Sequence, residues 1–539
     1  MNTPDKSSIV ERSPIARFFR WLFSWRGLRL LLIMLAWFVT LIALFHGEET
    51  WRGRRAWNQY RRELEAKGER LDYAALVPKP VPDDQNFAAT PAIKFWFEKK
   101  SSYDSDSAWN DTYSRVAENV QFPSKPKDAL FERRFVDLAA WETALAALAS
   151  GELTSQQKFY SGKLDAASRA KSAPAVLAGL KTNEALFAEL RLASQRPYSR
   201  YPVNYDMEMP YAILLPHLRM VKGVCQRLQL KACAELSSAQ GDQAMENIKL
   251  MFHLADSVKE DAILISYLVR IACGQLATQP IWEGLTEHRW SDSQLQELEL
   301  RLQQYNLIAD LSAPLLAEQA AGIATIELVR KKGLGYLNAL GSVEGTPTPV
   351  SAPTTFLGII IAPQGWYYQE ELNYCRGLHL ELATSLDTTK KRVSPAQVKA
   401  DTQAFQQMMS ATGLAETKVG VILRHRLMAT MLLPALGKVA MRAAMAQTAF
   451  NQTAIACALE RYRLANGHFP DKLEALAPQF ISSLPDDVLT GEPYKYRLTE
   501  EGRFVLYSVG WDEKDNGGVP GKRLFDEEQG DWVWEYPAK

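Results

Sequence analysis

The stretch Leu30–Phe45, LLLIMLAWFVTLIALF, decides the class of this protein. Its 16 residues carry no charge, and the only clearly polar side chain is the Thr40 hydroxyl, which a helix can satisfy on its own backbone. A bilayer core of about 30 Å needs about 20 helical residues, and the flanking residues extend the run to 28–47. We therefore expect a single N-terminal transmembrane helix over residues 28–47 that contacts the lipid bilayer.

Two other structures have the same apolar character, a buried core helix and a cleaved signal peptide. The signal peptide is disfavoured because 29 residues precede the run and no A-x-A cleavage pattern follows it. Arg29 lies just inside the predicted span, where its long side chain can return the guanidinium to the headgroups. The sequence favours an uncleaved anchor.

Basic residues lie on both sides of the predicted anchor. The tail at residues 1–27 interleaves arginines with Phe and Trp, a pattern typical of a cytoplasmic interfacial collar. Five arginines also follow the span, at positions 52, 54, 55, 61 and 62, so the two sides nearly balance. Because the upstream charges belong to a short tail, we predict that residues 1–27 are cytoplasmic and that the bulk of the chain lies outside.

Composition places the rest of the chain among ordinary globular proteins. It has 539 residues, of which 47% are hydrophobic and 23% charged, enough for two or three domains. Lys+Arg and Asp+Glu both total 62, so no net charge calls for a nucleic-acid partner. The five cysteines include no C-x-x-C, and we expect free, buried thiols, with a pair such as Cys225–Cys233 left open.

The hydrophobic periodicity predicts a mainly α protein with a small α+β end. Within it, Ser172 and Ser291 are predicted helix N-caps, and Glu501-Gly502 a hairpin turn between strands at Tyr494–Arg497 and Phe504–Ser508. The predicted segments after the span are a juxtamembrane helix and Pro-rich linker at 48–128, a helical body at 129–340, a Gly/Pro-rich loop at 341–366, a helical segment at 367–457 and an α+β module at 458–539.

A series of short motifs runs in order through residues 458–518. They are Tyr462-Arg463-Leu464-x-Asn466-Gly467-x-Phe469-Pro470, Leu473-Glu474-Ala475-Leu476, Leu484-Pro485-Asp486, Gly491-x-Pro493-Tyr494-x-Tyr496, Tyr507-Ser508-Val509-Gly510 and Asp515-Asn516-Gly517-Gly518. This series resembles the head domain of the major pseudopilin of type II secretion systems. The D-P-W-G turn of that family is replaced here, and its processing site with a Glu inside the hydrophobic helix is absent from Leu30–Phe45. We therefore expect a pseudopilin-like module joined to a large helical body, not a pilus subunit.

The resemblance carries several expectations. It implies a long helix packed against a small antiparallel sheet, and a periplasmic position for a protein held in the bacterial inner membrane. It also implies protein partners in the envelope, linked to secretion or to pilus-like assembly. Pseudopilin heads bind calcium near the loop Gly510–Gly518, where Asp512, Asp515 and Asn516 supply hard oxygen ligands. The alternative is a solvated polar turn that needs no metal.

No local motif for catalysis is present in the sequence. The seven histidines have no metal-ligand spacing, and there is no H-E-x-x-H, G-x-S-x-G, Walker A or dinucleotide fingerprint. We therefore assign no catalytic and no cofactor-binding residue, and we favour a membrane-anchored binding or scaffold protein. The alternative is an envelope enzyme, such as a hydrolase, whose active-site residues come from separate helices. A cleft with two or more buried carboxylates or a Ser/His pair would favour the enzyme, and an exposed apolar groove the binding protein.

Overall fold

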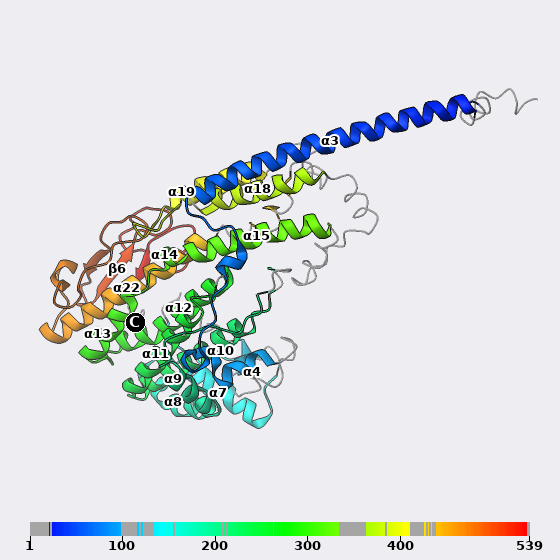
Figure 1. Cartoon of the computed structure of the whole chain (residues 1–539). Coiled ribbons are helices and arrows are strands. Elements are labelled where there is room, and N and C mark those ends of the chain that lie inside the picture. The colour runs from blue at the N-terminus through cyan, green and yellow to red at the C-terminus, as the bar shows by residue number, and fades with distance from the viewer. Residues whose placement is uncertain are drawn as a thin grey trace, which may run out of the picture. The chain divides into compact units, whose positions relative to one another are not determined.

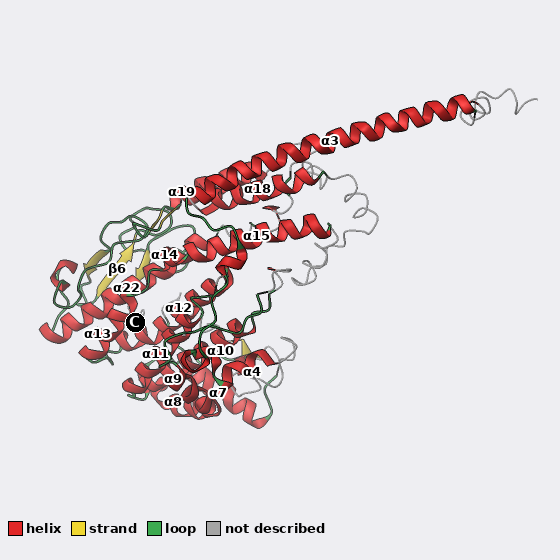
Figure 2. Cartoon of the chain, in the orientation of Figure 1, coloured by secondary structure: helices red, strands yellow, loops and turns green. Residues whose placement is uncertain are grey.

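A computed structural model of the chain is mainly helical (Figure 2). It describes residues 21, 24–98, 116–117, 120–121, 134–154, 157–205, 210, 213–261, 263–333, 363–382, 385–409, 425–426, 429–430, 433 and 438–535. The predicted loop at 341–366 falls almost entirely outside the described residues.

Fourteen α-helices and seven short strands are described, in the order shown by Figure 1. The helices are α3 (Trp25–Ala66), α4 (Pro91–Glu98), α7 (Leu138–Ser150), α8 (Ala166–Leu180), α9 (Glu184–Ala193), α10 (Pro216–Ser237), α11 (Gly241–Ser257), α12 (Leu264–Thr286), α13 (Asp292–Gln303), α14 (Leu307–Asp310), α15 (Ser312–Lys332), α18 (Gln364–Leu382), α19 (Pro395–Met409) and α22 (Val439–Asn466). The strands are β1 (Val120–Gln121), β2 (Gln157–Lys158), β3 (Leu386–Asp387), β4 (Arg392–Val393), β5 (Lys495–Leu498), β6 (Phe504–Ser508) and β7 (Trp532–Trp534).

The chain divides into two compact units. The first unit comprises Met1–Glu69, Ile326–Tyr374 and Gly413–Ala429, and the second comprises Arg70–Thr325, Cys375–Thr412 and Thr430–Lys539. These limits differ from the segments expected from the sequence, because helices distant in the sequence pack together within each unit. The predicted segment boundaries therefore stay predictions.

Helix α3 runs without a break through the apolar stretch and into the arginine-rich stretch beyond it, as predicted. The Thr40 hydroxyl donates to the Ala36 carbonyl at 2.7 Å, so the one polar group of the apolar run is satisfied inside the helix. The apolar window of α3 is not buried in the protein, and it fits a transmembrane helix or a signal helix. A second candidate, Asp292–Lys332, contains an apolar window of which 56% is buried, which is typical of core helices in soluble domains.

In the first unit, the second half of α3 packs closely on the start of α18. Gly53 and Gly365 face each other here, and a Cβ at either position would overlap the backbone of the other helix. Glu371 of α18 is fully buried in this unit, and neither of its carboxylate oxygens has a hydrogen-bond partner among the described residues. Burial, and then the nearby Glu327 carboxylate, raise the pKa of Glu371 to about 8.

The second unit is built on α10, α11 and α12, which all pack against one another. A hairpin of α7 and α8 packs on α10. Arg169 of α8 is fully buried. Its guanidinium pairs with Glu283 of α12 and with Glu287, the residue after that helix, and lies 4.3 Å above the ring of Phe135. Glu283 also accepts from the Val136 N–H at 2.8 Å. This buried charge pair joins α8, α12 and the chain before α7.

The C-terminal part packs the long helix α22 against an antiparallel sheet of order β5-β6-β7. The predicted hairpin is confirmed within one residue, since Lys495 pairs with Tyr507 and Leu498 with Phe504 around Gly502, which has φ of 72°. Gln452 of α22 donates to the Trp532 carbonyl at 2.7 Å. This is the arrangement of helix and sheet that the resemblance implies.

One of the two predicted helix caps is confirmed and one is wrong. Ser291 caps α13 in a capping box with Gln294. Ser172 instead lies buried inside α8, which begins two turns earlier because the Asp165 side chain accepts from the Ser168 N–H. Pro174 is therefore an interior residue of α8 rather than part of its first turn. The five cysteines are all free and buried, as expected.

We predict that Arg169→Met destabilises the second unit by about 3–5 kcal/mol, because it leaves the buried Glu283 carboxylate without its cation. Unfolding by urea of the full chain in a neutral detergent measures the change. Lys249→Met is the matched control, since Lys249 pairs with Glu246 and Glu297 at the surface, where such a pair contributes about 1 kcal/mol or less. Equal losses for the two variants would contradict the structural role of the buried pair.

Glu371 predicts a pH dependence of stability in the first unit. Because its folded pKa of about 8 lies above the ordinary 4.5, the folded state binds more protons between these values, and stability falls as pH rises through that window. We expect Glu371→Gln to remove this fall and to raise the free energy of unfolding at pH 8 by at least ~1.4 kcal/mol, the equivalent of one pKa unit. Unfolding at a series of pH values tests this, with the exposed Glu48→Gln as control. Parallel profiles for wild type and Glu371→Gln would exclude the predicted role of this carboxyl.

Candidate binding cleft

The second unit contains a cleft of about 980 Å³ whose walls come from four separate parts of the chain. One wall is the Pro-rich strap, here Leu76–Val81, together with the segment Ser194–Arg200 that follows α9. The opposite wall is the end of α11 with the loop after it, and the start of α15 with the end of α14. This volume is in the range of small-molecule and peptide sites.

The strap is fixed to the segment after α9 by main-chain pairing. Asn86 forms a parallel bridge with Tyr198, and the Phe87 N–H donates to the Tyr198 carbonyl at 2.7 Å. The Asn86 side chain donates to the Arg200 carbonyl and accepts from the Arg200 N–H, both at 2.8 Å. A segment that the sequence marks only as proline-rich is therefore held in one place by main-chain pairing and by the Asn86 side chain.

Three cations of this wall have no carboxylate partner among the described residues. Arg196 donates to the Asn86 carbonyl at 2.9 Å, and Arg200 donates to the Pro78 carbonyl at 3.3 Å. Lys79 lines the cleft and is exposed. Since main-chain carbonyls orient these arginines without neutralising them, the strap wall keeps a net positive charge.

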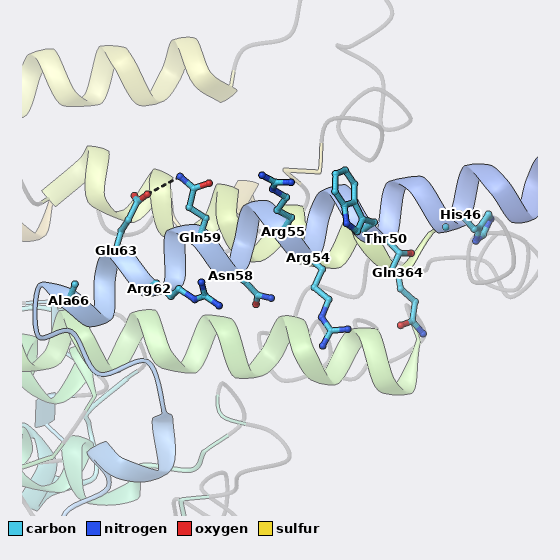
Figure 3. Close-up of a pocket in the computed structure, with 12 residues that line it drawn as sticks. His46, Thr50, Arg54, Arg55, Asn58, Gln59, Arg62, Glu63, Ala66 and Gln364 are labelled. Carbon is cyan, nitrogen blue, oxygen red and sulfur yellow. Dashed lines mark hydrogen bonds between the residues drawn. The ribbon is translucent and has the colours of Figure 1, made fainter.

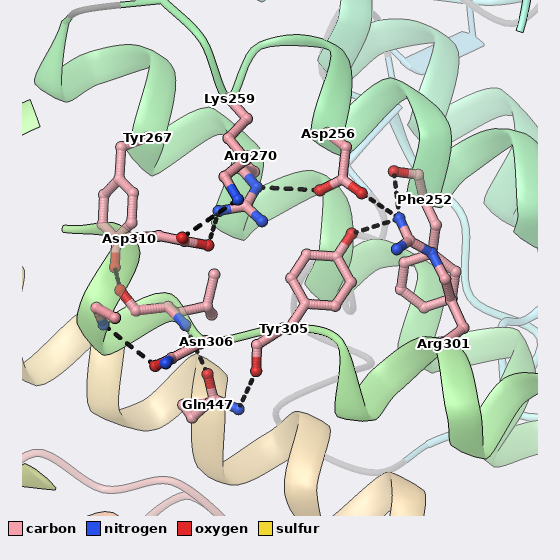
Figure 4. Close-up of polar contacts among 12 residues, drawn as sticks. Phe252, Asp256, Lys259, Tyr267, Arg270, Arg301, Tyr305, Asn306, Asp310 and Gln447 are labelled. Atoms are coloured by element: carbon pink, nitrogen blue, oxygen red, sulfur yellow. Dashed lines mark hydrogen bonds and ion pairs between the residues drawn. The ribbon is translucent and has the colours of Figure 1, made fainter. Parts of the chain in front are cut away.

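The opposite wall contains an ion-pair network of Arg270 and Arg301 with Asp256 and Asp310 (Figure 4), and the carboxylates Glu260 and Asp261 also line it. Arg270 lies between two carboxylates, with Nε 3.1 Å from Asp256 and an Nη 2.7 Å from Asp310. Arg301 also pairs with Asp256, and both guanidinium groups lie 5.1 Å from the centre of the Tyr305 ring. Burial alone would lower the pKa of Arg270, but the two carboxylates raise it, so the network stays ionised.

The base of the cleft is an aromatic stack around a buried histidine. The His217 ring packs against both Phe97 and Tyr201, at centroid distances of 5.5 and 4.3 Å, and those two rings also contact each other at 6.4 Å. Its Nε2 is 2.8 Å from Asp261, which lines the cleft, while the Tyr201 hydroxyl is 2.8 Å from the hydroxyl of Ser257. His217 itself is fully buried and does not line the cleft. His217 therefore orients the Asp261 carboxylate, but its own imidazole does not reach the cleft.

Two polar atoms facing this region lack partners among the described residues, the Ser199 hydroxyl and Nε2 of His253. The edge of the Phe87 ring packs against the His253 ring at 4.6 Å between centroids. Burial lowers the pKa of His253, which keeps the ring neutral and its Nε2 available for a hydrogen bond. Buried polar groups are normally satisfied, so an unsatisfied pair in a cleft is typical of a ligand site.

The residues predicted to bind calcium lie elsewhere, in the loop after β6. Asp512 accepts from the Lys514 and Gly530 N–H groups, at 3.3 and 3.2 Å, and Asp515 accepts from the Gly517 N–H at 2.9 Å. The Asn516 N–H donates to the buried Asp531, whose burial raises the pKa of that carboxyl.

Two of the three predicted calcium ligands thus cap backbone groups, and sequence reasoning missed Asp531. Among the described residues, no group of three or more His, Cys, Asp or Glu side chains is gathered as metal ligands. The calcium site and the metal-free turn both stay predictions.

Sequence reasoning also missed the cleft, because its walls come from segments that have no motif in common. The Pro-rich strap was the one local signal, and it was interpreted as a spacer or a cover over the body. No protein-family model matches the chain, and the curated proteins and the solved structures give no match either. The geometry of the cleft therefore carries the functional argument.

We expect Tyr201→Phe to destabilise the second unit by about 1 kcal/mol, because it removes a buried hydrogen bond to Ser257 beneath the cleft. Tyr198→Phe is the control, since that ring is 50% exposed and its main-chain bonds to the strap are kept. Its effect is expected to be below about 0.5 kcal/mol. Chemical unfolding of the two variants decides the question, and equal effects would mean that the stack does not support the cleft.

Proposed function

We propose that this chain is a membrane-anchored periplasmic binding protein that docks an acidic peptide segment of an envelope partner in the cleft. The observation that carries the proposal is the strap wall, where Lys79, Arg196 and Arg200 have no carboxylate partner among the described residues. A carboxylate-bearing peptide would neutralise these cations. It would also offer main-chain groups to Ser199 and His253, whose polar atoms are unsatisfied.

Ser199, His253 and several carboxylates line the cleft, and such groups would favour the alternative, a hydrolase of the envelope. We favour binding because arginine or histidine side chains hold Asp256, Asp261 and Asp310 in ion pairs or hydrogen bonds. General acid–base chemistry needs a titratable group that reaches the substrate with a pKa near the working pH. His217 is buried behind Asp261, while Asp256 and Asp310 are each paired with arginine. These groups hold the walls of the cleft in place, and such a role is consistent with a preformed binding site.

The anchor would supply the second part of the mechanism. A protein confined by α3 to the plane of the bilayer meets partners in the same membrane at a raised effective concentration. The packing of α22 on the β5-β6-β7 sheet and the motifs in residues 458–518 support a pseudopilin-like module. We therefore propose that the partners belong to secretion or pilus-like assembly.

Site-specific photo-crosslinking in cells tests the cleft. A photoreactive phenylalanine at Tyr198, which lines the cleft, should capture a discrete partner whose crosslinked peptide is acidic. The same group at Tyr160 is the matched control, because that ring is also exposed, at 62% against 50%, and does not line the cleft. Equal capture at both positions, or a crosslinked peptide without acidic residues, would refute the proposal.

The charge of the strap wall is tested separately by Lys79→Glu. Because Lys79 has no ion-pair partner among the described residues, its reversal changes the charge of the cleft with little effect on the fold. We expect on the order of tenfold less crosslinking from Tyr198, the loss that ~1.4 kcal/mol of binding free energy produces. Lys495→Glu, an equal reversal at the exposed start of β5, should leave capture unchanged.

A further inference from the structure

A second hollow, of about 1210 Å³, lies in the first unit along the face of α3 that follows the apolar stretch (Figure 3). His46, Thr50 and Trp51 line its end nearest the apolar stretch, and Arg54, Arg55 and Arg62 line the rest together with polar side chains. Figure 3 shows Arg54, Asn58 and Arg62 in one row along the helix, on the side of Gln364. One carboxylate, Glu63, also lines the hollow, so its charged lining of three arginines and one glutamate is net basic, and it begins where the apolar surface ends.

Five arginines follow the apolar stretch, at positions 52, 54, 55, 61 and 62. Those that line the hollow differ from the others in their ion pairs. Arg52 and Arg61 do not line it, and each has a carboxylate partner, Glu49 at 2.6 Å and Glu65 at 2.8 Å.

The three arginines that line the hollow, Arg54, Arg55 and Arg62, have no carboxylate partner among the described residues. Arg55 lies over the exposed ring of Trp51 at 5.4 Å, which orients its guanidinium without neutralising it. Among the five arginines at 52–62, those without a carboxylate partner are thus the ones at the hollow.

The position of these arginines along the helix matches the depth of lipid phosphates. With a rise of ~1.5 Å per residue, Arg54 and Arg55 lie roughly 10–12 Å beyond residue 47, where the apolar span ends. Side chains on a helix point toward its N-terminus, which here is toward the bilayer. The guanidinium groups of Arg54 and Arg55 therefore lie much closer to the end of the apolar span than their Cα atoms do. The headgroup layer extends roughly 5–8 Å beyond the hydrocarbon. Trp51 lies at the same level, as interfacial tryptophans do.

We propose that this hollow binds the phosphodiester headgroup of an anionic phospholipid in the leaflet that faces the folded body. The proposal rests on the proposed membrane anchor and adds a specific lipid contact to it. Arg54 would hold the phosphate oxygens through paired N–H donors, the geometry in which guanidinium surpasses ammonium. Arg55, which Figure 3 shows on the other side of α3 with Gln59 and Glu63, would add to the local positive charge. Asn58 and Gln364 would hydrogen-bond the polar alcohol of the headgroup.

The test uses the full chain purified in a neutral detergent and analysed by native mass spectrometry with added lipid. We expect retention of phosphatidylglycerol and much weaker retention of phosphatidylcholine of the same acyl chains. Arg54→Gln with Arg55→Gln should lower phosphatidylglycerol retention on the order of tenfold. Arg61→Gln with Arg70→Gln removes the same charge outside the hollow and should leave retention unchanged.

The following results would overturn the proposal. Equal retention of the two lipids, or equal loss in both double variants, would show that the hollow does not select an anionic headgroup. If millimolar inorganic phosphate displaces the lipid and stabilises the protein by itself, the site takes a free anion and not a lipid.

Failure of the anchor is seen independently, because extraction of cell membranes at alkaline pH would then release the protein, or its N-terminal mass would show cleavage. Retention in the membrane without lipid preference would refute this inference alone.

Discussion

The burial of α22 on nearly all sides is the constraint on which the second unit depends. From Val439 to Arg461 every residue but one is buried, so the polar side chains of this helix must find partners inside the protein. Gln447 donates to the Tyr305 carbonyl and accepts from the Leu307 N–H, while Gln452 donates to the Trp532 carbonyl. A shift of the helix by one residue would leave these amides unsatisfied, so they fix its position against the helical body and the sheet together.

That constraint reaches the cleft through Tyr305. Because Gln447 holds the main chain of Tyr305, the ring above it is held under Arg270 and Arg301, and those two arginines in turn position Asp256 and Asp310 (Figure 4). Each of these two arginines is held twice, by an ion pair and by the Tyr305 ring. The strap wall differs in kind, since its cations are oriented by carbonyls and remain to be neutralised. The cations of the strap wall therefore face a wall that also presents Glu260 and Asp261 to the cleft, and a ligand carboxylate would bind on the strap side.

The features that the sequence predicted correctly are those determined within a few residues. The N-cap at Ser291, the hairpin around Gly502 and the continuity of α3 follow from local hydrogen bonding, local φ preference and apolar content. Ser172 was assigned wrongly because a serine before Pro174 is also compatible with a helix interior, and Asp165 is the better cap. The cleft and the Arg169–Glu283 pair join residues more than 100 positions apart, and no local pattern encodes such contacts.

The equal totals of positive and negative residues likewise give no sign of the cleft or of the hollow on α3. Lys+Arg and Asp+Glu are equal over the whole chain, and this equality argued against a nucleic-acid partner. Equality of totals says nothing about pairing, however, and pairing is uneven here. Arginines such as Arg169 and Arg270 are buried and matched by carboxylates, because an unmatched buried charge would unfold the unit. Arg54 and Arg200 line hollows open to solvent, where hydration lets a cation stay unpaired until a ligand arrives. The candidate sites of this protein therefore lie where the fold leaves cations without a carboxylate partner, and the composition alone does not determine where that is.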